Sequence, residues 1–284
     1  MTAKLQEVRA QLDLAFVRHG ERTILGRRLF RWPYVLTRTF ALDQAPAHLL
    51  TVILQTSSSA LHGGDWLHQR FHIGSGAAAH CTTQGASPIH RAAPELTTHE
   101  AVAIEVKPEG YFEYLPEARI LFPDAALDQI IDIDCAPGGV ALVADTFTIH
   151  DPMALDRSFR RLCSTLTLRC GGEPMLVDRM DIRSLGRGRT AANKAFGTML
   201  LARPGQDDAN VRMADELSKL LAEIPDLYAA ASVLPAGAGL GVRLAGRELR
   251  HVRKGTLAAW TYIRRELYGA APAARRMQEE DAGL

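Results

Sequence analysis

The chain has 284 residues, and its 33 Lys and Arg side chains nearly balance its 32 Asp and Glu side chains, which gives a net charge of +1. This balance argues against a uniformly basic nucleic-acid-binding protein and against a protein with an acidic tail. No run of about 18 apolar residues exists that could span a bilayer, and the first residues lack the apolar core of a signal peptide. We therefore expect a cytoplasmic protein that binds neither a membrane nor nucleic acid.

Four cysteines are scattered along the chain without any Cys-x-x-Cys pair, namely Cys81, Cys135, Cys163 and Cys170. This usage fits a reducing compartment and argues against zinc-ribbon and thioredoxin-like folds. We expect the four thiols to be free and to serve as small buried apolar side chains.

Short apolar runs with a period of two dominate residues 12–205, and Gly, Pro, Asp and Ser separate them. In one such run Val102, Ile104 and Val106 alternate with Ala103 and Glu105. A strand with one dry face and one polar face is typical of antiparallel sheets packed on one side. No alternation of strands with helices appears, which argues against a doubly wound nucleotide-binding fold. The pattern predicts a mainly β protein built of stacked antiparallel sheets.

Two stretches near the end of the chain change to a helical period. In the first, apolar residues recur in three- and four-residue steps at Val211, Ala214, Leu217, Leu221 and Ile224, just before Pro225. In the second, the same steps connect Leu257, Trp260, Ile263 and Leu267, with Arg264 on the polar side and Gly269 as the stop. Both are amphipathic patterns. We expect a single domain over residues 1–269, β-rich over 12–205 and helical within 206–269.

The last residues, 270–284, contain little apolar surface, and we expect them to form a flexible tail. The charge is banded. Residues 95–156 contain thirteen acidic and two basic side chains, whereas residues 157–203 contain ten basic and three acidic ones. Such bands are typical of solvated faces, and they can also steer a protein partner or a cation.

A search for catalytic signatures gives little. The chain has no phosphate-binding GxxxxGK[ST] loop, no GxSxG nucleophile elbow and no HExxH metal motif. We therefore expect no enzymatic activity and assign no catalytic residue. A β-rich hydrolase or sugar-binding module remains an alternative.

Histidines gather in the first third of the chain, at positions 62, 68, 72, 80 and 90. On a strand, residues four apart such as His68 and His72 lie about 13 Å from each other, too far to share one ion unaided. Surface or turn histidines are one interpretation. The other is a set of weak imidazole and carboxylate ligands that pass a borderline metal such as nickel or zinc. Asp65 follows two glycines, so it is either such a ligand or the acceptor of an Asx turn.

Several segments, in chain order, resemble the urease accessory protein family UreD, also called UreH. They are Leu54–Ser57, Gly63–Asp65, Thr82–Ala86 followed by Arg91, and Phe112–Glu117. The Glu-Tyr-Leu-Pro string and the upstream Gly-Gly-Asp are the most specific parts. The motif positions that match the family are Gly63, Gly64, Thr83, Arg91, Tyr114, Leu115 and Pro116. Weaker similarity extends over residues 12–268.

The resemblance implies a mainly β, non-catalytic scaffold that helps to deliver nickel to apo-urease. It implies three partners: a helical accessory protein like UreF, a GTPase like UreG that is reached through it, and apo-urease itself. It also implies no tightly bound cofactor, because nickel is present only in transit.

Under this resemblance, we expect nickel to pass carboxylate and imidazole groups at Asp65, Glu113, Asp145 and His150. A carboxylate can hold a divalent ion briefly without the affinity of a thiolate site. For the helical partner we expect a surface on the last helix at Trp260, Tyr262 and Arg264, since large amphipathic residues anchor interfaces. Burial of Trp260 against its own sheet is the alternative.

The chain departs from the family within Asp145–Phe159, where the family's Gly-Arg and Gly-Glu pairs are missing and Pro152 is present. A divergent paralogue that acts as an adaptor for another assembly is therefore an alternative function. Asp145 follows the apolar run Val140–Val143, so we expect it to point inward. There, together with His150, it would form a polar lining near Asp65.

Overall fold

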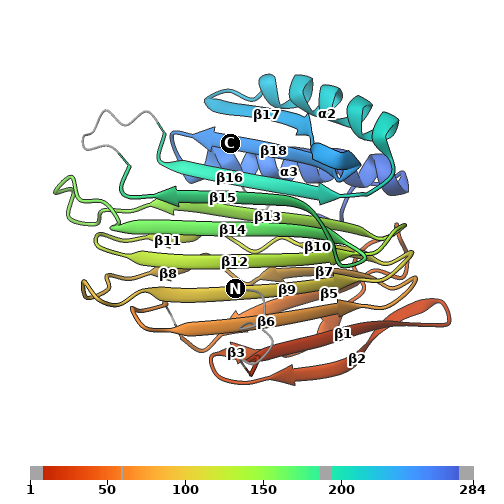
Figure 1. The fold of residues 1–284 in the computed structure, drawn as a ribbon, viewed down its shortest axis with the longest axis horizontal. Helices are drawn as coiled ribbons and strands as arrows, with labels where there is room; N and C mark the ends of the chain where they lie inside the picture. Colours follow the sequence, from red (N-terminus) through yellow and green to blue (C-terminus); the bar gives the residue numbers. More distant parts are fainter. Residues whose placement is uncertain (1–8, 59, 186–192, 275–284) are drawn as a thin grey trace.

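The computed structural model describes residues 9–58, 60–185 and 193–274. Two β-sheets pack face to face, as Figure 1 shows, and share a core of apolar side chains. In spatial order the seven-stranded sheet contains β15 (Glu173–Ile182), β14 (Arg161–Cys170), β12 (Ala126–Cys135), β9 (Thr98–Val106), β6 (Trp66–Ile73), β1 (Leu12–His19) and β2 (Arg22–Phe30).

The second sheet has eleven strands. Its main path contains β17 (Leu227–Val233), β18 (Gly239–Gly246), β16 (Ala195–Ala202), β13 (Val140–Ile149), β10 (Tyr111–Tyr114), β7 (Ala78–Thr83), β5 (Leu50–Thr56) and β3 (Tyr34–Val35). Three short strands attach beside this path, namely β4 (Thr39–Phe40), β8 (Ser87–Ile89) and β11 (Arg119–Leu121).

The sheets are mixed, whereas the sequence pattern predicted antiparallel pairing. In the middle of the molecule the chain crosses to the other sheet after almost every strand and then returns, and we call one such round trip a coil. A strand therefore pairs with the strand of the same sheet that the chain forms one coil later. Because each coil returns in the same direction, β6, β9, β12 and β14 run parallel, as do β5, β7, β10 and β13. Antiparallel pairs occur at the ends, for example β1 with β2 and β14 with β15. The prediction of a mainly β class is confirmed.

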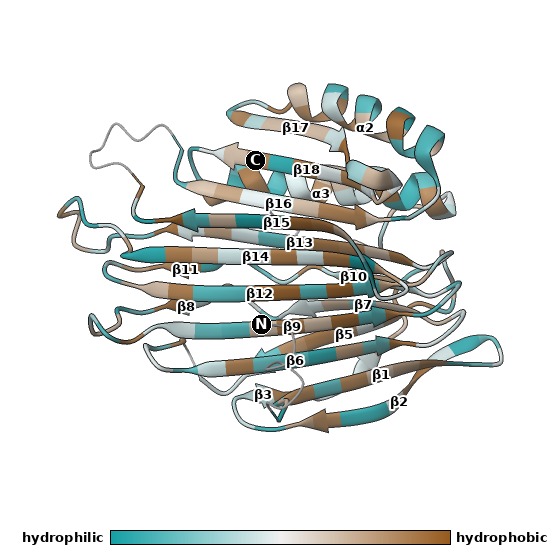
Figure 2. Ribbon diagram, in the orientation of Figure 1, coloured by the Kyte–Doolittle hydropathy of each residue, from teal (hydrophilic) through white to brown (hydrophobic). Residues whose placement is uncertain are grey.

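The period-two pattern accounts for the core between the sheets. Hydrophobic and hydrophilic bands alternate along the strands in Figure 2. On β9 the inward side chains Val102, Ile104 and Val106 are buried. The ring of Phe71 in β6 lies 5.2 Å from that of Phe112 and 5.4 Å from that of Tyr114, so aromatic contacts join the two sheets.

Both predicted helices are present, as α2 (Asp207–Ala222) and α3 (Leu249–Tyr268), and a short 3₁₀ turn, η1 (Pro235–Gly237), lies between them. They lie beside β17 and β18 at one end of the eleven-stranded sheet (Figure 1) and enclose a second core with it. Gly269 ends α3 in a left-handed conformation, with φ of 73°. One detail of the prediction is wrong: Arg264 is fully buried and does not lie on the polar face.

All four cysteines are free; Cys170 is half-buried and the other three are buried. The predicted tail lies mostly outside the described residues, which end at residue 274. Within the part of the chain that the structure describes, no helix is both long and apolar enough to cross a membrane.

Candidate functional site

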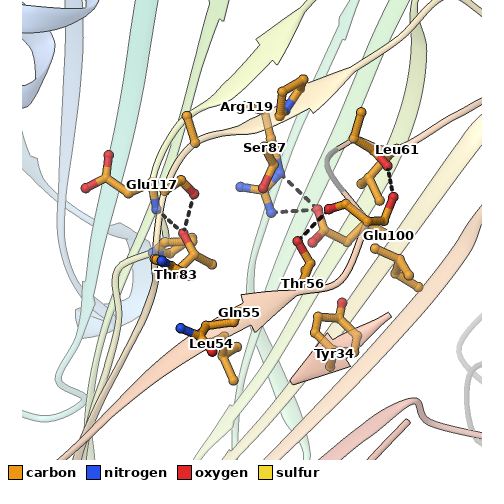
Figure 3. A pocket seen from close by; sticks show the side chains of 18 of the residues that line it. Tyr34, Leu54, Gln55, Thr56, Leu61, Thr83, Ser87, Glu100, Glu117 and Arg119 are labelled. Atoms are coloured by element: carbon orange, nitrogen blue, oxygen red, sulfur yellow. Dashed lines mark hydrogen bonds and ion pairs between the residues drawn. The ribbon is translucent and has the colours of Figure 1, made fainter. Parts of the chain in front are cut away.

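A cavity of about 370 Å³ opens between the two sheets (Figure 3). Its walls come from both sheets: Gln69 of β6 and Glu100 of β9 on one side, Leu54 of β5 and Tyr114 of β10 on the other. Three of the four motif segments converge on it, since residues 54–56, 83–88 and 116–117 all contribute to the lining, whereas Gly63–Asp65 does not. Segments that are far apart in the sequence therefore build one site, which we call the inter-sheet pocket.

Threonines fix the rim of the inter-sheet pocket. The hydroxyl of Thr83 donates a hydrogen bond to the carbonyl of Gly85 (3.0 Å) and accepts one from the backbone N–H of Glu117 (2.9 Å), as Figure 3 shows. The hydroxyl of Thr82 donates to the carbonyl of Leu115 at 2.7 Å. These bonds join the end of β7 to the segment after β10, which gives the Thr83 and Leu115 motif positions a structural role.

A buried ion pair forms the floor of the inter-sheet pocket. Arg119 donates from Nη2 (2.6 Å) and Nε (2.9 Å) to one carboxylate oxygen of Glu100. On its other side, Nη1 of Arg119 donates to Asp145 Oδ1 at 3.3 Å. Burial by itself would lower the pKa of Arg119, but the charges of Glu100 and Asp145 raise it above its usual value. The guanidinium is therefore a permanent positive charge between two carboxylates.

Further polar groups extend this network between the sheets. Gln69 donates to the second oxygen of Glu100 (3.1 Å), and Ser164 of β14 donates to Asp145 Oδ2 (3.1 Å). Tyr114 donates to Gln69 at 3.5 Å, and burial raises the pKa of its hydroxyl above the usual range. Sequence reasoning missed Glu100 and Arg119. A signal existed for Glu100, which shares the inward parity of Val102 and Ile104 and so is a charged residue at a core position.

Glu113 belongs to a different, fully buried cluster. Its carboxylate accepts hydrogen bonds from His80 Nδ1 (2.6 Å), the hydroxyl of Tyr111 (2.5 Å), Trp260 Nε1 (2.8 Å) and Arg264 Nε (2.5 Å). Burial alone would raise the pKa of Glu113, but the hydrogen bond from His80 and the charges of His80 and Arg264 lower it to about 2. The carboxylate is thus ionised, and side chains of the protein itself already bind its oxygen atoms.

The predicted partner-binding residues of α3 lie mostly inward. Trp260 is 4% exposed and stacks on the His80 ring at 5.1 Å. Arg264 also donates to the carbonyl of Ala45 (2.8 Å) and to Asp43 (3.1 Å). Tyr262 is half-buried. Trp260 is therefore buried against its own sheet, as the alternative interpretation of this residue predicts.

Asp65 accepts a hydrogen bond from the backbone N–H of His62 at 2.8 Å, so it caps a tight turn. Gly64 has φ of 93°, a conformation that favours glycine. A Cβ atom on Gly63 would lie 2.6 Å from that of Ala92, so this close approach requires glycine. Asp65 is half-buried and is not part of the lining of the inter-sheet pocket.

His150 lies apart from Asp65, Glu113 and Asp145. It is exposed, and its ring meets that of Phe122 edge-on at 5.2 Å. Phe122 and Arg91 line a second cavity of about 470 Å³, together with His62 and His90. The structure thus places Asp145 behind the floor of the inter-sheet pocket and Asp65, Glu113 and His150 in three other environments. No group of three or more His, Cys, Asp and Glu side chains among the described residues could hold a metal ion.

Comparison with known proteins agrees with the resemblance of the motifs. The family model described as "UreD urease accessory protein" matches residues 8–279. A Bradyrhizobium protein named urease accessory protein UreD 2 is 49% identical over 93% of this chain and 92% of its own length. Urease accessory protein UreD 1 of Methylorubrum extorquens is 34% identical over 94% and 92%, and UreD of Mycolicibacterium smegmatis is 32% identical over 92% and 90%. The chain belongs to the UreD family of urease accessory proteins, which is an accessory family and not an enzyme family.

Proposed function

We propose that this protein is a non-catalytic scaffold that assists nickel insertion into apo-urease. It acts together with a helical accessory protein like UreF and a GTPase like UreG. The inter-sheet pocket carries the proposal. Three of the segments that match the family build its rim, and Glu100 at its floor shares Arg119 with Asp145 behind it. Because these groups lie inside the sandwich, an ion that reached them would be shielded from competing ligands in solution.

The chemistry of the pocket suits transit better than storage. Among the residues that the structure describes, the ionisable groups of its lining include carboxylates and one guanidinium but no thiolate, so the pocket would hold a borderline divalent ion weakly. Arg119 neutralises part of the negative charge of Glu100 and Asp145, which lowers the affinity for a cation further. Of the four residues expected to contact nickel, Asp145 is the one that we still propose to lie on the route of the ion.

The helical end of the molecule is the surface that we propose for the UreF-like partner. Trp260 and Arg264 support this surface indirectly, because their hydrogen bonds to Glu113 anchor α3 to the sheet. The opposite side of α3, with Arg253 and Arg265, is exposed and would contact the partner. Arg253 also forms an ion pair of 2.7 Å with Glu117, which lines the inter-sheet pocket. A partner on α3 would thus sit beside the pocket rim.

Co-expression with urease subunits and the other accessory proteins tests the proposal. Tagged protein should recover urease subunits, the helical accessory protein and the GTPase. Asp145→Asn should lower the nickel content and activity of the urease while leaving this recovery intact. The matched control is Asp132→Asn, which also removes an arginine-paired carboxylate but on the outer face of β12, where Arg169 lies 2.6 Å away.

Two results would overturn the proposal. One is urease activation that does not depend on co-expression of this chain. The other is a stable complex that contains no urease subunit, which would support the adaptor function instead.

A further inference from the structure

Two of the free thiols lie at the ends of neighbouring strands. Cys135 is the last residue of β12 and Cys170 is the last residue of β14. The two strands lie side by side in the sheet (Figure 1), run parallel and keep one unbroken register up to the pair of Asp134 and Arg169. The next position along this ladder therefore places Cys135 beside Cys170.

Both thiols belong to the inward face of the seven-stranded sheet. On β12, Ile133 and Cys135 are buried in the core between the sheets. On β14, Leu166 and Leu168 are the inward residues, and Cys170 follows them with the same parity. Because side chains alternate between the two faces of a strand, Cys135 and Cys170 share one face at one register position.

Two further observations place the thiols close together. The backbone N–H of Gly172 donates to Asp134 Oδ1 at 3.1 Å, so the turn after β14 is held against the end of β12. Burial raises the pKa of the Cys135 thiol to about 12, and the charge of Cys170 adds to this rise. Neighbouring strands lie about 4.8 Å apart, which is within the Cα separation of about 4.4–6.8 Å that a disulfide bond spans.

The other two cysteines have different neighbours. In the strand register Cys163 lies between two aspartates, and Cys81 lies between a valine and a tyrosine. Cys170 also differs from the other three in exposure, since it is half-buried and they are buried. It precedes the exposed turn at Gly171 and Gly172. A small oxidant can therefore reach Cys170 from solution.

We propose that Cys135 and Cys170 form a site of reversible oxidation, which hydrogen peroxide converts to a disulfide. The sulfur of Cys170 attacks the peroxide first; the O–O bond breaks, the sulfur becomes a sulfenic acid and one water is released. The sulfur of Cys135 then attacks that of Cys170. The S–S bond forms, the S–O bond breaks, and the hydroxyl group leaves with the proton of Cys135 as a second water. Two thiols are oxidised and one peroxide is reduced, and a dithiol reductant reverses the reaction by exchange.

The disulfide would close residues 135–170 into a covalent loop. This loop contains β13 with Asp145, so oxidation would tie one whole coil of the sandwich together. A cross-link of this kind restricts the unfolded chain and so favours the folded state. The inference is independent of the proposed function, because it depends only on the positions of the two thiols.

Peptide mapping after oxidation tests the site. Full-length protein is treated with hydrogen peroxide, the remaining thiols are alkylated, and the protein is digested with trypsin. Arginines separate Cys135, Cys163 and Cys170 in the sequence, so trypsin places them in different peptides. We expect the peptides of residues 120–157 and 170–179 to be linked, with a mass lower by two hydrogen atoms than that of the reduced pair.

Variants and thermal unfolding make the test specific. Cys170→Ser should abolish the linked pair, whereas the matched control Cys163→Ser, on the opposite face of the same strand, should leave its yield unchanged. The oxidised wild type should unfold at a temperature about 5 °C higher than the reduced form, and dithiothreitol should reverse this rise.

Either of two results would overturn the proposal. One is oxidation of Cys170 to a sulfinic acid in the wild type while Cys135 is still alkylated, which would show that the two thiols do not meet. The other is linkage of Cys170 to Cys81 or to a second molecule with the same yield. Neither result bears on nickel insertion, which the co-expression experiment measures separately.

Discussion

At the scale of single residues, the carboxylate of Glu113 differs in its chemistry from those of Glu100 and Asp145. Glu113 accepts hydrogen bonds from four different side chains, and one of them, Arg264, is itself fully buried. A metal ion would have to displace these donors to bind it. Glu100 and Asp145 share a single arginine, Arg119. Glu100 lines the inter-sheet pocket and Asp145 lies behind its floor, so a metal ion would have to displace fewer donors there. We therefore assign Glu113 to stability and Asp145 to the path.

Glu113→Gln should destabilise the fold strongly. The change removes the negative charge that compensates buried Arg264 and places an amide N–H₂ among donors. Breaking a buried ion pair from one side costs about 3 kcal/mol or more, which urea unfolding would measure as a lower midpoint. The matched control is Glu105→Gln, at an outer-face carboxylate that is 38% exposed and paired with Lys107 and His72, where we expect little change. Equal stability of the two variants would contradict the assignment.

The same residue predicts a pH dependence. The pKa of Glu113 is about 2 in the folded protein, against an ordinary value of 4.5. A group with a lowered folded pKa contributes stability above its unfolded pKa and loses it as the pH falls through the folded one. Unfolding measured from pH 5 downward should therefore show a loss of stability between about pH 4.5 and 2 in the wild type. Glu113→Gln should show a shallower slope in this range, and an identical slope would contradict the prediction.

At the scale of elements, α3 is held in place by its polar contacts as well as by its apolar face. Trp260 and Arg264 both reach Glu113, which lies 147 and 151 positions away in the chain. Deleting the helix would expose the second core and remove both contacts. A truncation would then report on folding, so partner binding is better tested on the exposed side of α3.

Trp260→Phe should separate the hydrogen bond from the packing. Phenylalanine keeps an aromatic ring beside His80 but cannot donate to Glu113. Loss of a hydrogen bond to a charged group costs about 2 kcal/mol, which thermal or urea unfolding can detect. Tyr262→Phe, on the same helix, is the control because its hydroxyl is not among the donors to Glu113. A Trp260→Phe variant as stable as this control would show that stacking alone holds the helix.

The turn before β6 offers a second test at this scale. An alanine Cβ at Gly63 would lie 2.6 Å from Ala92 Cβ and 2.9 Å from its Cα, so one backbone would have to shift. We expect Gly63→Ala to cost roughly 2 kcal/mol of unfolding free energy. Gly85→Ala, on the pocket rim, meets no atom within 4 Å and should be nearly neutral. The reverse order of the two variants in urea unfolding would contradict this explanation of the Gly-Gly motif.

At the scale of the whole molecule, the charge bands of the sequence do not form separate faces. Asp132 of the acidic band pairs with Arg169 of the basic band at 2.6 Å, because β12 and β14 are neighbours in the sheet. Within the basic band, Arg161 binds Asp181 at 2.8 Å across β14 and β15. Because the parallel coils place strands of the acidic band beside strands of the basic band, ion pairs between neighbouring strands neutralise much of the charge of both bands. The bands are thus weak evidence for steering a partner.

The sequence by itself determined the class of the fold, both helices and the family. Period-two burial and three- and four-residue helical steps are local signals, so Val102–Val106 and Leu257–Leu267 could be assigned from a few neighbouring residues. Thr83, Tyr114 and Pro116, identified as motif positions, do line the inter-sheet pocket. The alternation within a strand reports which face is buried, however, and contains no information on the direction of its neighbour.

The tertiary structure decided the direction of the strands and the composition of the site. Glu100 and Arg119 meet because β9 and β11 belong to different sheets that pack face to face, and Glu113 meets Arg264 across 151 positions of chain. The helical pattern predicts that Arg264 faces solvent, because the pattern contains no information on the buried carboxylate of Glu113 that pairs with it. Pairing of charges between distant segments depends on how the coils stack, and the periodicity of any one segment does not encode that stacking.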